Sequence, residues 1–320
     1  MRTLVLCSSV FAAVSICAAQ GPAVMGAGFA NPFPIAVAPG QSLTLFVQPG
    51  AGYDPSAPLP SVSAVYWNGS TGETMPLLQV NQTEAACNVP PNSGCTNLLA
   101  VTVQVPFDAP IVPSTISNVI VVSTSVAVSI NGATTSYFGV QPSQDHVHIL
   151  TACDLIAGAS PAFLSYRGVS CAPVVTHADG IPVAAIFPAA AGEELIAYAT
   201  GLGQTNPPLT TGHPAAQSSP TVDAFNLDFN YRPNALATEP LSTGPVPLFA
   251  GATQGFVGLY QINFVVPPAP AGTLPCVDFA VLPLEASNAG NTVHSNLTVS
   301  IGSAFSFDGA GICVQTPPVP

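Results

Sequence analysis

The sequence predicts an all-β protein made of two tandem immunoglobulin-like β-sandwich domains joined by a disulfide-bearing linker. From Phe33 onward, short β-branched or aromatic runs alternate with clusters of Pro, Gly, Asn and Ser, and the 35 prolines disfavour long helices. Each half contains about seven such runs, which is the strand count of an immunoglobulin-like sandwich. One plan of strand and turn also occurs twice, which indicates a duplicated domain.

The duplication is clearest in two pairs of matched stretches. Residues 39–48 and 192–200 each contain a small turn, polar residues and then an apolar run. The second run ends at Gly201 and Gly203, which tolerate the positive φ that a tight turn needs. The alternating apolar positions of residues 99–106 align at a constant offset with those of residues 260–267. Two matched stretches in the same order support two related domains.

Individual strands are predicted from period-two alternation and flanking turn residues. Along residues 98–105 the apolar side chains share one face and Thr102 and Gln104 the other, so this strand is expected to be half buried. The predicted strands of the first half are 33–38, 42–48, 62–67, 75–80, 98–105, 119–130 and 136–140. Those of the second half are 183–187, 195–200, 222–231, 246–250, 259–266, 277–284 and 293–301.

Residues 1–19 have the plan of a cleavable secretory signal. Arg2 is followed by an apolar core and then by small residues before Gln20. Cys17 suggests a lipoprotein, but Ile16 stands where such sites need a small residue, so we expect no lipid. The segment is too short to span a membrane, and no later stretch is long and apolar enough. We therefore expect the protein to be extracellular or at the cell surface.

Charge narrows the range of partners. Removal of Arg2 with the signal changes the net charge from −12 to −13 and leaves no lysine and two arginines, Arg167 and Arg232. A surface of this sign repels nucleic acids and anionic membranes. Only 6% of the residues are charged, whereas soluble monomers usually carry far more. The composition therefore predicts self-association or contact with other cell-surface proteins.

Six cysteines remain after signal removal, and an even count in an exported protein predicts three disulfides. Fifteen connectivities are possible for six cysteines. Pairing of nearest neighbours predicts Cys87 with Cys95, Cys153 with Cys171, and Cys276 with Cys313. None of the spacings matches the close pair of pairs that zinc sites use.

These features define the expected domain boundaries. We predict a signal peptide at 1–19, a first sandwich at 20–140, a linker at 141–180, a second sandwich at 181–315 and a Pro-rich tail at 316–320. The Cys153–Cys171 loop is expected to stiffen the linker and hold the domains in a fixed orientation. The apolar segment 20–34 either covers its own sandwich or pairs with a sheet edge of a neighbouring copy.

Several motifs of the second half occur together in one known family. They are Val175-Thr-His-Ala-Asp-Gly180, Tyr198-Ala-Thr-Gly-Leu-Gly203 with Asn206-Pro207, Gly258-Leu-Tyr-Gln-Ile-Asn263 with Val266-Pro267, and Ser295-Asn296. With them, residues 141–301 resemble the uncharacterised C-terminal domain that recurs in secreted acidobacterial (Solibacter-type) proteins. The first half shares only the duplicated pattern and lacks a counterpart of Gly201-Leu-Gly203. The resemblance implies an immunoglobulin-like domain in an exported bacterial protein, and it implies no catalytic residues.

Asp145, His146 and His148 are the candidate metal ligands. Residues two apart on a strand share a face, and two imidazoles with a nearby carboxylate suit zinc or copper. The alternative is that the histidines line the domain junction and hydrogen bond to backbone carbonyls. His177 lies near Asp179, whose simplest role is to stabilise a turn. No nucleophile elbow or phosphate-binding loop is present, so we predict no catalytic residue and no cofactor.

Aromatic residues leave a second function open. Tyr53, Tyr66 and Trp67, together with Tyr231, suit either a sugar-binding platform or a sandwich core. The first hypothesis is thus a non-enzymatic structural or adhesive surface protein that acts by association, for example as a fibre or surface-layer subunit. The alternative is an extracellular carbohydrate-binding module. The third is a metal-dependent hydrolase around His146 and His148. Asp308 is expected in a loop.

Overall fold

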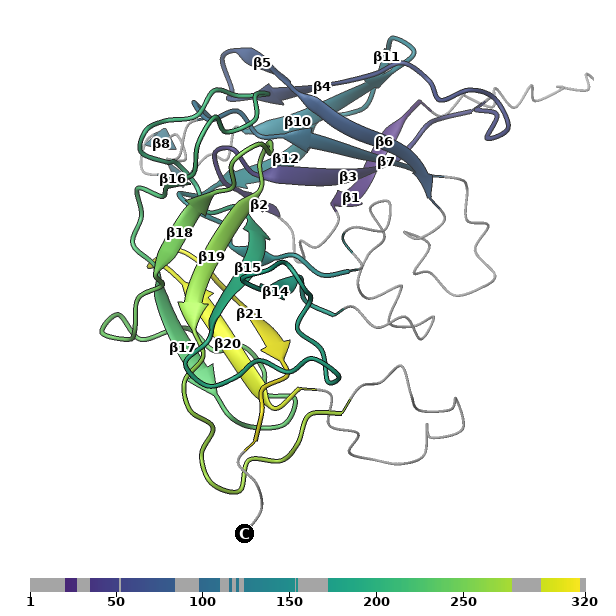
Figure 1. Cartoon of the computed structure of the whole chain (residues 1–320). Helices are drawn as coiled ribbons and strands as arrows, with labels where there is room; N and C mark the ends of the chain where they lie inside the picture. Colours follow the sequence, from purple (N-terminus) through teal and green to yellow (C-terminus); the bar gives the residue numbers. More distant parts are fainter. Residues whose placement is uncertain are drawn as a thin grey trace, which may run out of the picture.

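The computed structural model describes residues 21–27, 35–51, 53–83, 98–109, 115–116, 119–120, 124–152, 154, 172–277 and 295–316. All regular structure in these ranges is β, and no helix occurs in them. The strands of residues 21–142 form one half of the molecule, drawn above in purple to teal, and the later strands form the other half below (Figure 1). A helix of the length and apolarity that a membrane crossing requires is missing from the described ranges.

Two sheets build the N-terminal half. The first has the order β1-β3-β7-β6, with all neighbours antiparallel. The second has the order β2-β12-β10-β4-β5, in which β2 and β12 run parallel, and β11 also pairs with β10. The strands are β1 Ala23–Ala27, β2 Ile35–Val37, β3 Ser42–Gln48, β4 Val62–Trp67, β5 Gly72–Met75, β6 Leu77–Thr83, β7 Leu98–Gln104, β10 Ser125–Ile130, β11 Ala133–Thr134 and β12 Phe138–Pro142.

The two sheets enclose one hydrophobic core. Leu45 and Val101 of the first sheet and Tyr66 and Val128 of the second belong to the same buried cluster. On the opposite face of the first sheet, the hydroxyls of Thr44 and Thr102 are hydrogen bonded at 2.9 Å. The half-buried state predicted for this strand is wrong, because Ala100 and Gln104 on its other face are buried too. Gln104 is covered by the C-terminal half, as shown below.

The C-terminal half also has two main sheets. The larger has the order β13-β15-β19-β18-β16, and β14 pairs with β15. The smaller has the order β17-β20-β21. Its strands and those of the larger sheet share a second hydrophobic core that includes Leu195, Tyr260, Phe264, Leu297 and Val299. The strands are β13 His148–Ile149, β14 Val175–His177, β15 Glu194–Thr200, β16 Ser219–Pro220, β17 Asn226–Asn230, β18 Phe249–Ala252, β19 Tyr260–Val265, β20 Leu297–Gly302 and β21 Phe307–Ile312.

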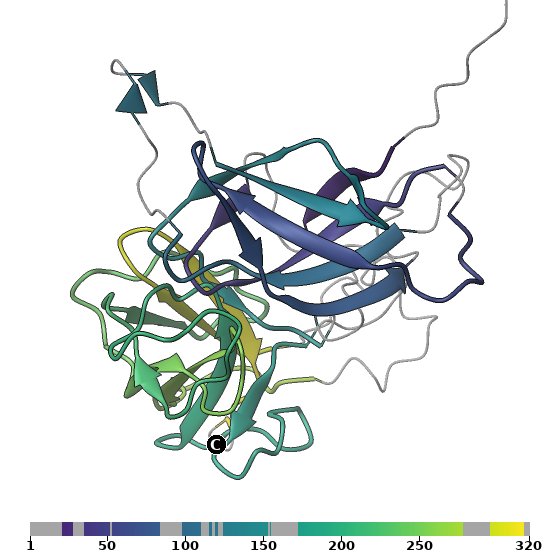
Figure 2. The same cartoon turned by 90° about the horizontal axis from the view of Figure 1, so that it is seen from above.

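A small antiparallel pair, β8 (Thr115–Ile116) with β9 (Val119–Ile120), belongs to neither half's main sheets. It lies away from both in the view from above (Figure 2).

Several strands differ from the sequence-based expectation. Residues 183–187 form no strand, and only an isolated bridge joins Ala184 to Phe187. Asp308 lies in strand β21 rather than in a loop. The glycines of β21 have low strand propensity, so the sequence does not indicate a strand there. Glycine is needed at position 309 because an added Cβ would lie 2.4 Å from the Cβ of Ala237. β13 and β14 fall within the predicted linker and are too short to show a periodic pattern.

The N-terminal strand of the described residues pairs with its own half. β1 is antiparallel to β3, with Ala23 opposite Gln48 and Ala27 opposite Leu45. The register shifts between Val24 and Gly26, as at a β-bulge. Residues 23–27 thus occupy an edge of their own sheet. Of the two arrangements expected for this segment, they adopt the one within the chain and not the one with a neighbouring copy.

The Cys276–Cys313 disulfide is confirmed. Cys313 follows β21 directly, so the bond ties the end of the chain to residue 276. Asn296 reinforces this end, because its side chain donates to the carbonyl of Val314 and accepts from the amide of Val314, both at 2.9 Å. Cys87, Cys95, Cys153 and Cys171 lie outside the described residues, as does the signal segment 1–19.

Replacing both cysteines, Cys276→Ser with Cys313→Ser, is expected to lower the free energy of unfolding by about 2–4 kcal/mol. The bond closes a loop with a sequence separation of 37 residues, so its loss gives the unfolded chain more freedom. Equilibrium denaturation of the double variant measures the effect. An unchanged denaturation midpoint would contradict the stabilising role.

Candidate functional site

The two halves meet at a polar junction. The Gln41 side chain lies 3.2 Å from Nδ1 of His146, and Oε1 of the buried Gln104 accepts the Gly212 amide at 2.6 Å. The Phe107 amide donates to Oγ1 of Thr211 at 2.9 Å. These hydrogen bonds join side chains and backbone more than 100 positions apart, and they fix the contact between the halves.

The glycine turn after β15 lies at this junction. Gly201 and Gly203 have φ values of 76° and 81°, which confirms the positive φ expected from the sequence. The His146 amide donates to the Gly201 carbonyl at 2.6 Å. An added Cβ at Gly201 would lie 1.9 Å from the carbonyl oxygen of His146, and one at Gly203 would lie 2.3 Å from that of Gln144. Glycine is therefore required for both conformation and space.

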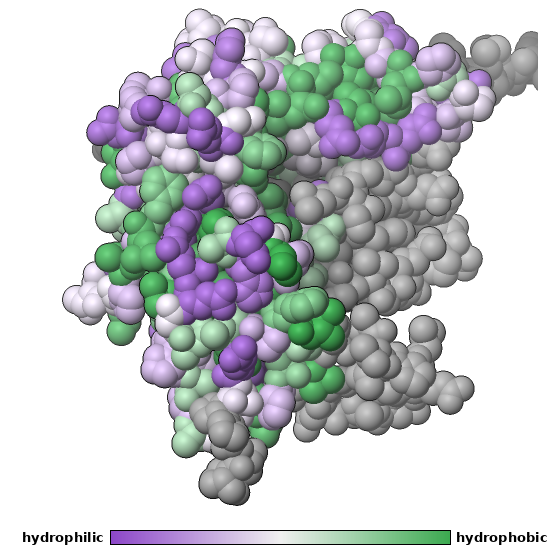
Figure 3. Space-filling model, viewed as in Figure 1, coloured by the Kyte–Doolittle hydropathy of each residue, from purple (hydrophilic) through white to green (hydrophobic). Residues whose placement is uncertain are grey.

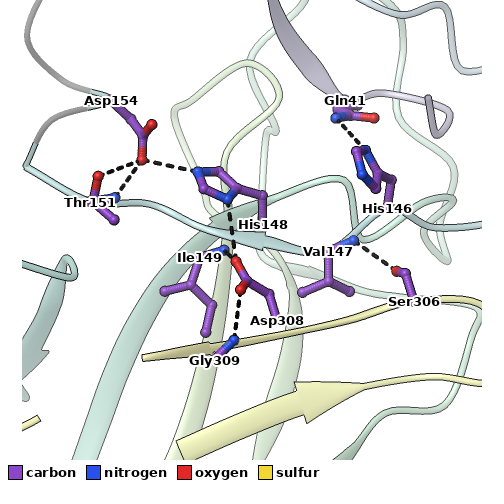
Figure 4. A network of polar contacts seen from close by, with 10 residues as sticks. All are labelled: Gln41, His146, Val147, His148, Ile149, Thr151, Asp154, Ser306, Asp308 and Gly309. Atoms are coloured by element: carbon purple, nitrogen blue, oxygen red, sulfur yellow. Dashed lines mark hydrogen bonds and ion pairs between the residues drawn. The ribbon is translucent and has the colours of Figure 1, made fainter. Parts of the chain in front are cut away.

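The segment that faces this turn contains the predicted metal ligands. Val147 and Ile149 are buried in the C-terminal core, and Asp145 is fully buried. His146 and His148 point to the opposite side of the chain (Figure 4). Their sharing of one face is confirmed, but the carboxyl of Asp145 is hydrogen bonded to Ser306 and not to either histidine. No group of three or more His, Cys, Asp or Glu side chains is arranged to hold a metal ion within the described ranges.

His148 lies between two carboxylates (Figure 4). Its Nε2 is 3.0 Å from Oδ2 of Asp154 and its Nδ1 is 3.2 Å from Oδ2 of Asp308. Burial alone would lower the pKa of His148, but the hydrogen bonds and negative charges of the two aspartates outweigh it and raise the pKa to about 9. The imidazolium is therefore the form at neutral pH. Both ring nitrogens are thus engaged with carboxylate oxygens.

His148, Asp154 and Asp308 together form what we call the histidine clamp. The two aspartates anchor this clamp to the backbone. Asp154 accepts from the amide and hydroxyl of Thr151 at 2.7 and 2.8 Å. Asp308 accepts the Ile149 amide at 2.9 Å and the Gly309 amide at 2.8 Å. The clamp joins residues 148–154 to β21, and sequence reasoning did not identify either aspartate as its partner.

His146 is the neutral histidine of the pair. Burial lowers its pKa, and the positive charge of His148 lowers it further. Since the side-chain amide nitrogen of Gln41 only donates, Nδ1 of His146 accepts and carries no proton. Gln41 is itself held by the Ala38 amide, which donates to its Oε1 at 2.8 Å. His146 thus lies at the junction, as considered for it, but its ring contacts the Gln41 side chain rather than a backbone carbonyl.

Asp145 is bound on the other side of the chain. Ser306 donates its hydroxyl to Oδ1 of Asp145, and the same hydroxyl oxygen accepts the Val147 amide at 2.9 Å. Oδ2 of Asp145 is buried and has no hydrogen-bond partner among the described residues. Burial raises the pKa of Asp145, with a contribution from the charge of Asp223. These contacts give the carboxyl a structural position in the C-terminal half.

Two hollows open along the junction. One, of about 220 Å³, lies between polar side chains of the first sheet, such as Thr44 and Thr102, and Asp154 and Thr200 of the C-terminal half. The other, of about 590 Å³, is lined by Glu73, Asp108, Phe107 and Leu209 among others. Burial raises the pKa of Glu73, and the charge of Asp108 adds to this.

His177 forms a separate surface pair. Its Nδ1 donates to Oε1 of Glu193 at 2.5 Å and its Nε2 donates to the Phe187 carbonyl at 3.1 Å. The hydrogen bond to Glu193 is the main cause of the raised pKa of His177. Asp179 is not its partner but accepts the Ile181 amide at 3.0 Å, which confirms its predicted turn role. The side chains of His177 and Glu193 are 16% and 28% exposed, so the pair is partly shielded from water.

The predicted aromatic residues have different roles. Tyr66 is fully buried, and Tyr53 and Tyr231 pack against the two cores. The hydroxyl of Tyr53 accepts the Gln82 amide at 2.6 Å, and that of Tyr231 donates to the Pro267 carbonyl at 2.5 Å. Tyr53 and Tyr231 are half-buried, and so is Trp67.

The ring of Trp67 has a partner, Tyr137, that the sequence analysis did not single out. The two ring centroids are 6.1 Å apart. Alternation offered a signal, since Tyr137 precedes the buried Phe138.

Fold and junction together define an all-β protein with a disulfide and a histidine held between two aspartates. No protein-family model matches the chain, and no curated protein matches it.

Proposed function

We propose that the chain is a secreted, non-enzymatic protein of two tandem immunoglobulin-like sandwiches that acts by association with copies of itself, as a structural or adhesive subunit at the cell surface. Strand order supports the tandem arrangement. The run β3-β7-β6 in the N-terminal half corresponds to β15-β19-β18, and the run β4-β10-β12 corresponds to β17-β20-β21. Six strands thus recur in the same chain order and the same division between sheets. This repetition supports duplication of one domain.

The observation that carries the association is an apolar strap on the C-terminal half, residues 234–246. The strap runs across the outer face of the β17-β20-β21 sheet. Thr298 donates its hydroxyl to the Ala235 carbonyl at 2.9 Å, and the Thr238 amide donates to the Ser300 hydroxyl at 3.1 Å. Further along, the Leu227 amide donates to the Pro245 carbonyl at 2.7 Å. The backbone of the strap is therefore fixed on the sheet.

Large apolar side chains of this strap project into solvent. Leu236, Leu241 and Val246 are 82%, 74% and 70% exposed. Phe305 and Phe307 of the adjacent hairpin are also exposed, and Phe307 and Pro240 both lie against Gly302. Glu239 is the only ionisable residue within 234–246. A fixed backbone that presents exposed apolar side chains is a surface suited to association.

Charged side chains are few, at 6% of the residues, and the net charge of −12 that opposes contact between copies is screened by salt. The chain has only three basic residues, so its solubility depends largely on uncharged polar groups. Hydrophobic residues on the face shown in Figure 3 form separate groups divided by hydrophilic ones. Burying apolar surface contributes roughly 25 cal/mol per Å², and a stable interface buries roughly 800 Å² per partner, so the exposed side chains of the strap would form the apolar centre of a larger contact.

A triple variant of the strap tests the association. We expect the mature chain to form assemblies whose mass grows with concentration, and the variant Leu236→Ser, Leu241→Ser, Val246→Ser to remain monomeric. Light scattering after size exclusion measures both. A matched control, Leu59→Ser with Ile186→Ser and Val222→Ser, changes exposed apolar residues elsewhere and should still assemble. Equal behaviour of strap variant and control would refute the role of the strap.

The proposal of a non-enzymatic protein rests on the junction. His148 has both nitrogens engaged with aspartates, and the carboxyl of Asp145 accepts a hydrogen bond from Ser306 rather than contacting either histidine. A metal-dependent hydrolase around His146 and His148 would need these groups to converge. Zinc or copper bound in stoichiometric amount, found by elemental analysis of protein purified without chelators, would favour the hydrolase instead.

A further inference from the structure

An aromatic pair lies on the outer face of the second N-terminal sheet. Trp67 is the only tryptophan in the chain, and its ring plane is inclined by 47° to that of Tyr137. Tyr137 is 64% exposed, and Trp67 is partly exposed. An added Cβ at Gly72 would lie 2.9 Å from Cε3 of Trp67, so the indole covers this glycine on the neighbouring strand. The pair forms a surface platform rather than part of the core.

Small residues surround the platform. The strand register places Ser125 beside Trp67 and Gly139 beside Ser125, while Ala127 lies opposite Val65. Because these side chains are short, the two rings are the most prominent groups on this part of the sheet. A flat ligand can therefore approach both rings without meeting other large side chains.

The outward positions on and beside β4, β10 and β12 are uncharged. These alternating positions from residues 63 to 67, 125 to 129 and 137 to 141 hold hydroxyl, amide, small or aromatic side chains. They are Ser63, Val65, Trp67, Ser125, Ala127, Ser129, Tyr137, Gly139 and Gln141. This face offers no cation for an acidic ligand and no anion for a basic one.

We propose that this aromatic platform binds a neutral saccharide, with one sugar ring over each aromatic ring. One face of a pyranose ring is lined by C–H groups, which are apolar and carry a slight positive charge, so they are attracted to the negative face of an aromatic ring. The sugar hydroxyls extend sideways, where Ser125, Ser129 and Gln141 are hydrogen-bonding partners. The proposal is independent of the association surface on the strap, which lies in the other half.

The size of the platform favours a saccharide over a second copy of the chain. A fully buried Trp or Tyr buries roughly 150–250 Å². Both rings are already partly covered here, so together they supply well under the roughly 800 Å² per partner of a stable protein interface. Large apolar residues that would extend the contact are missing from the outward positions named above. Two sugar rings, in contrast, need no larger area.

Fluorescence of the single tryptophan gives a direct test. We expect a saturable change in Trp67 emission when the mature protein is titrated with cellohexaose, xylohexaose or mannohexaose, and no change with an oligogalacturonate, whose carboxylates the acidic chain repels. Tyr137→Ala should weaken binding by roughly tenfold, which corresponds to about 1.4 kcal/mol. The exposed aromatic Phe256 of the other half provides the control, and Phe256→Ala should bind as the unmodified protein does.

Calorimetry extends the test to the tryptophan itself. Trp67→Ala should abolish binding, whereas Trp67→Phe should retain a weakened interaction because it keeps an aromatic ring. Failure of all three neutral hexaoses to bind would overturn the proposal. Concentration-dependent dimerisation without sugar that Tyr137→Ala removes would also overturn it and assign the platform to a second copy.

Discussion

Replacing Gly201 with Ala is expected to lower the free energy of unfolding by at least about 4 kcal/mol, among the largest effects of a single substitution. The left-handed φ of 76° costs a residue with a Cβ about 1–2 kcal/mol. The remaining cost comes from the clash of that Cβ with the His146 carbonyl oxygen, at 1.9 Å. The added Cβ is attached directly to the backbone and the His146 oxygen belongs to it, so no side-chain rotation relieves the clash.

Gly192 provides a matched control for this substitution. Its φ of 82° is similar, but an added Cβ there has nothing within 4 Å. Gly192→Ala should therefore cost only the conformational part, about 1–2 kcal/mol. Equilibrium denaturation of both variants separates conformation from packing. Equal losses for the two variants would show that the junction does not need the space at Gly201.

Replacing His148 with Gln is expected to destabilise the protein by about 3–5 kcal/mol, because it leaves Asp154 and Asp308 without their cation. The side chains of His148 and Asp154 are only 14% and 8% exposed, so water compensates little. The exposed His213 serves as the control, and His213→Gln should change stability by less than about 0.5 kcal/mol.

The same clamp predicts how stability depends on pH. The pKa of His148 is about 9 in the folded protein, against about 6.5 in an unfolded chain. A raised pKa in the folded state means that the stabilisation is complete below about pH 6.5 and is lost as pH rises through about 9. The difference corresponds to about 3 kcal/mol.

Urea denaturation between pH 6 and 10 tests this dependence. The unmodified protein should lose stability across the range, and His148→Gln should lose much less over the same range. A parallel pH dependence of the two proteins would contradict the role of the clamp.

The sequence predicted local structure where side chains alternate regularly. The bounds of β3 and β4 agree with the expected 42–48 and 62–67, because apolar and polar residues alternate between clear turns. β21 was missed, since its glycines have low strand propensity and its pairing with β20 depends on tertiary packing. Local pattern is therefore sufficient for a strand with a clear alternation, but not for one specified by its neighbours.

The candidate site shows the same limit. The sequence placed a tight turn at Gly201, and its junction alternative fits His146, which contacts Gln41, whereas His148 pairs with Asp154 and Asp308 of the C-terminal half. The partners of the two histidines were not predictable, because Asp308 lies 160 positions from His148 and Gln41 lies 105 positions from His146. Tyr137 was missed for a similar reason, since its position beside Trp67 depends on the pairing of β10 with two other strands.

Electron microscopy of the untagged mature protein, collected from its native producer, tests the proposed function most directly. The account predicts fibres or sheets at the cell surface or in the medium, built from a repeating subunit with the size of one chain. Dispersed monomers at every concentration, in the medium and on the cells, would contradict it.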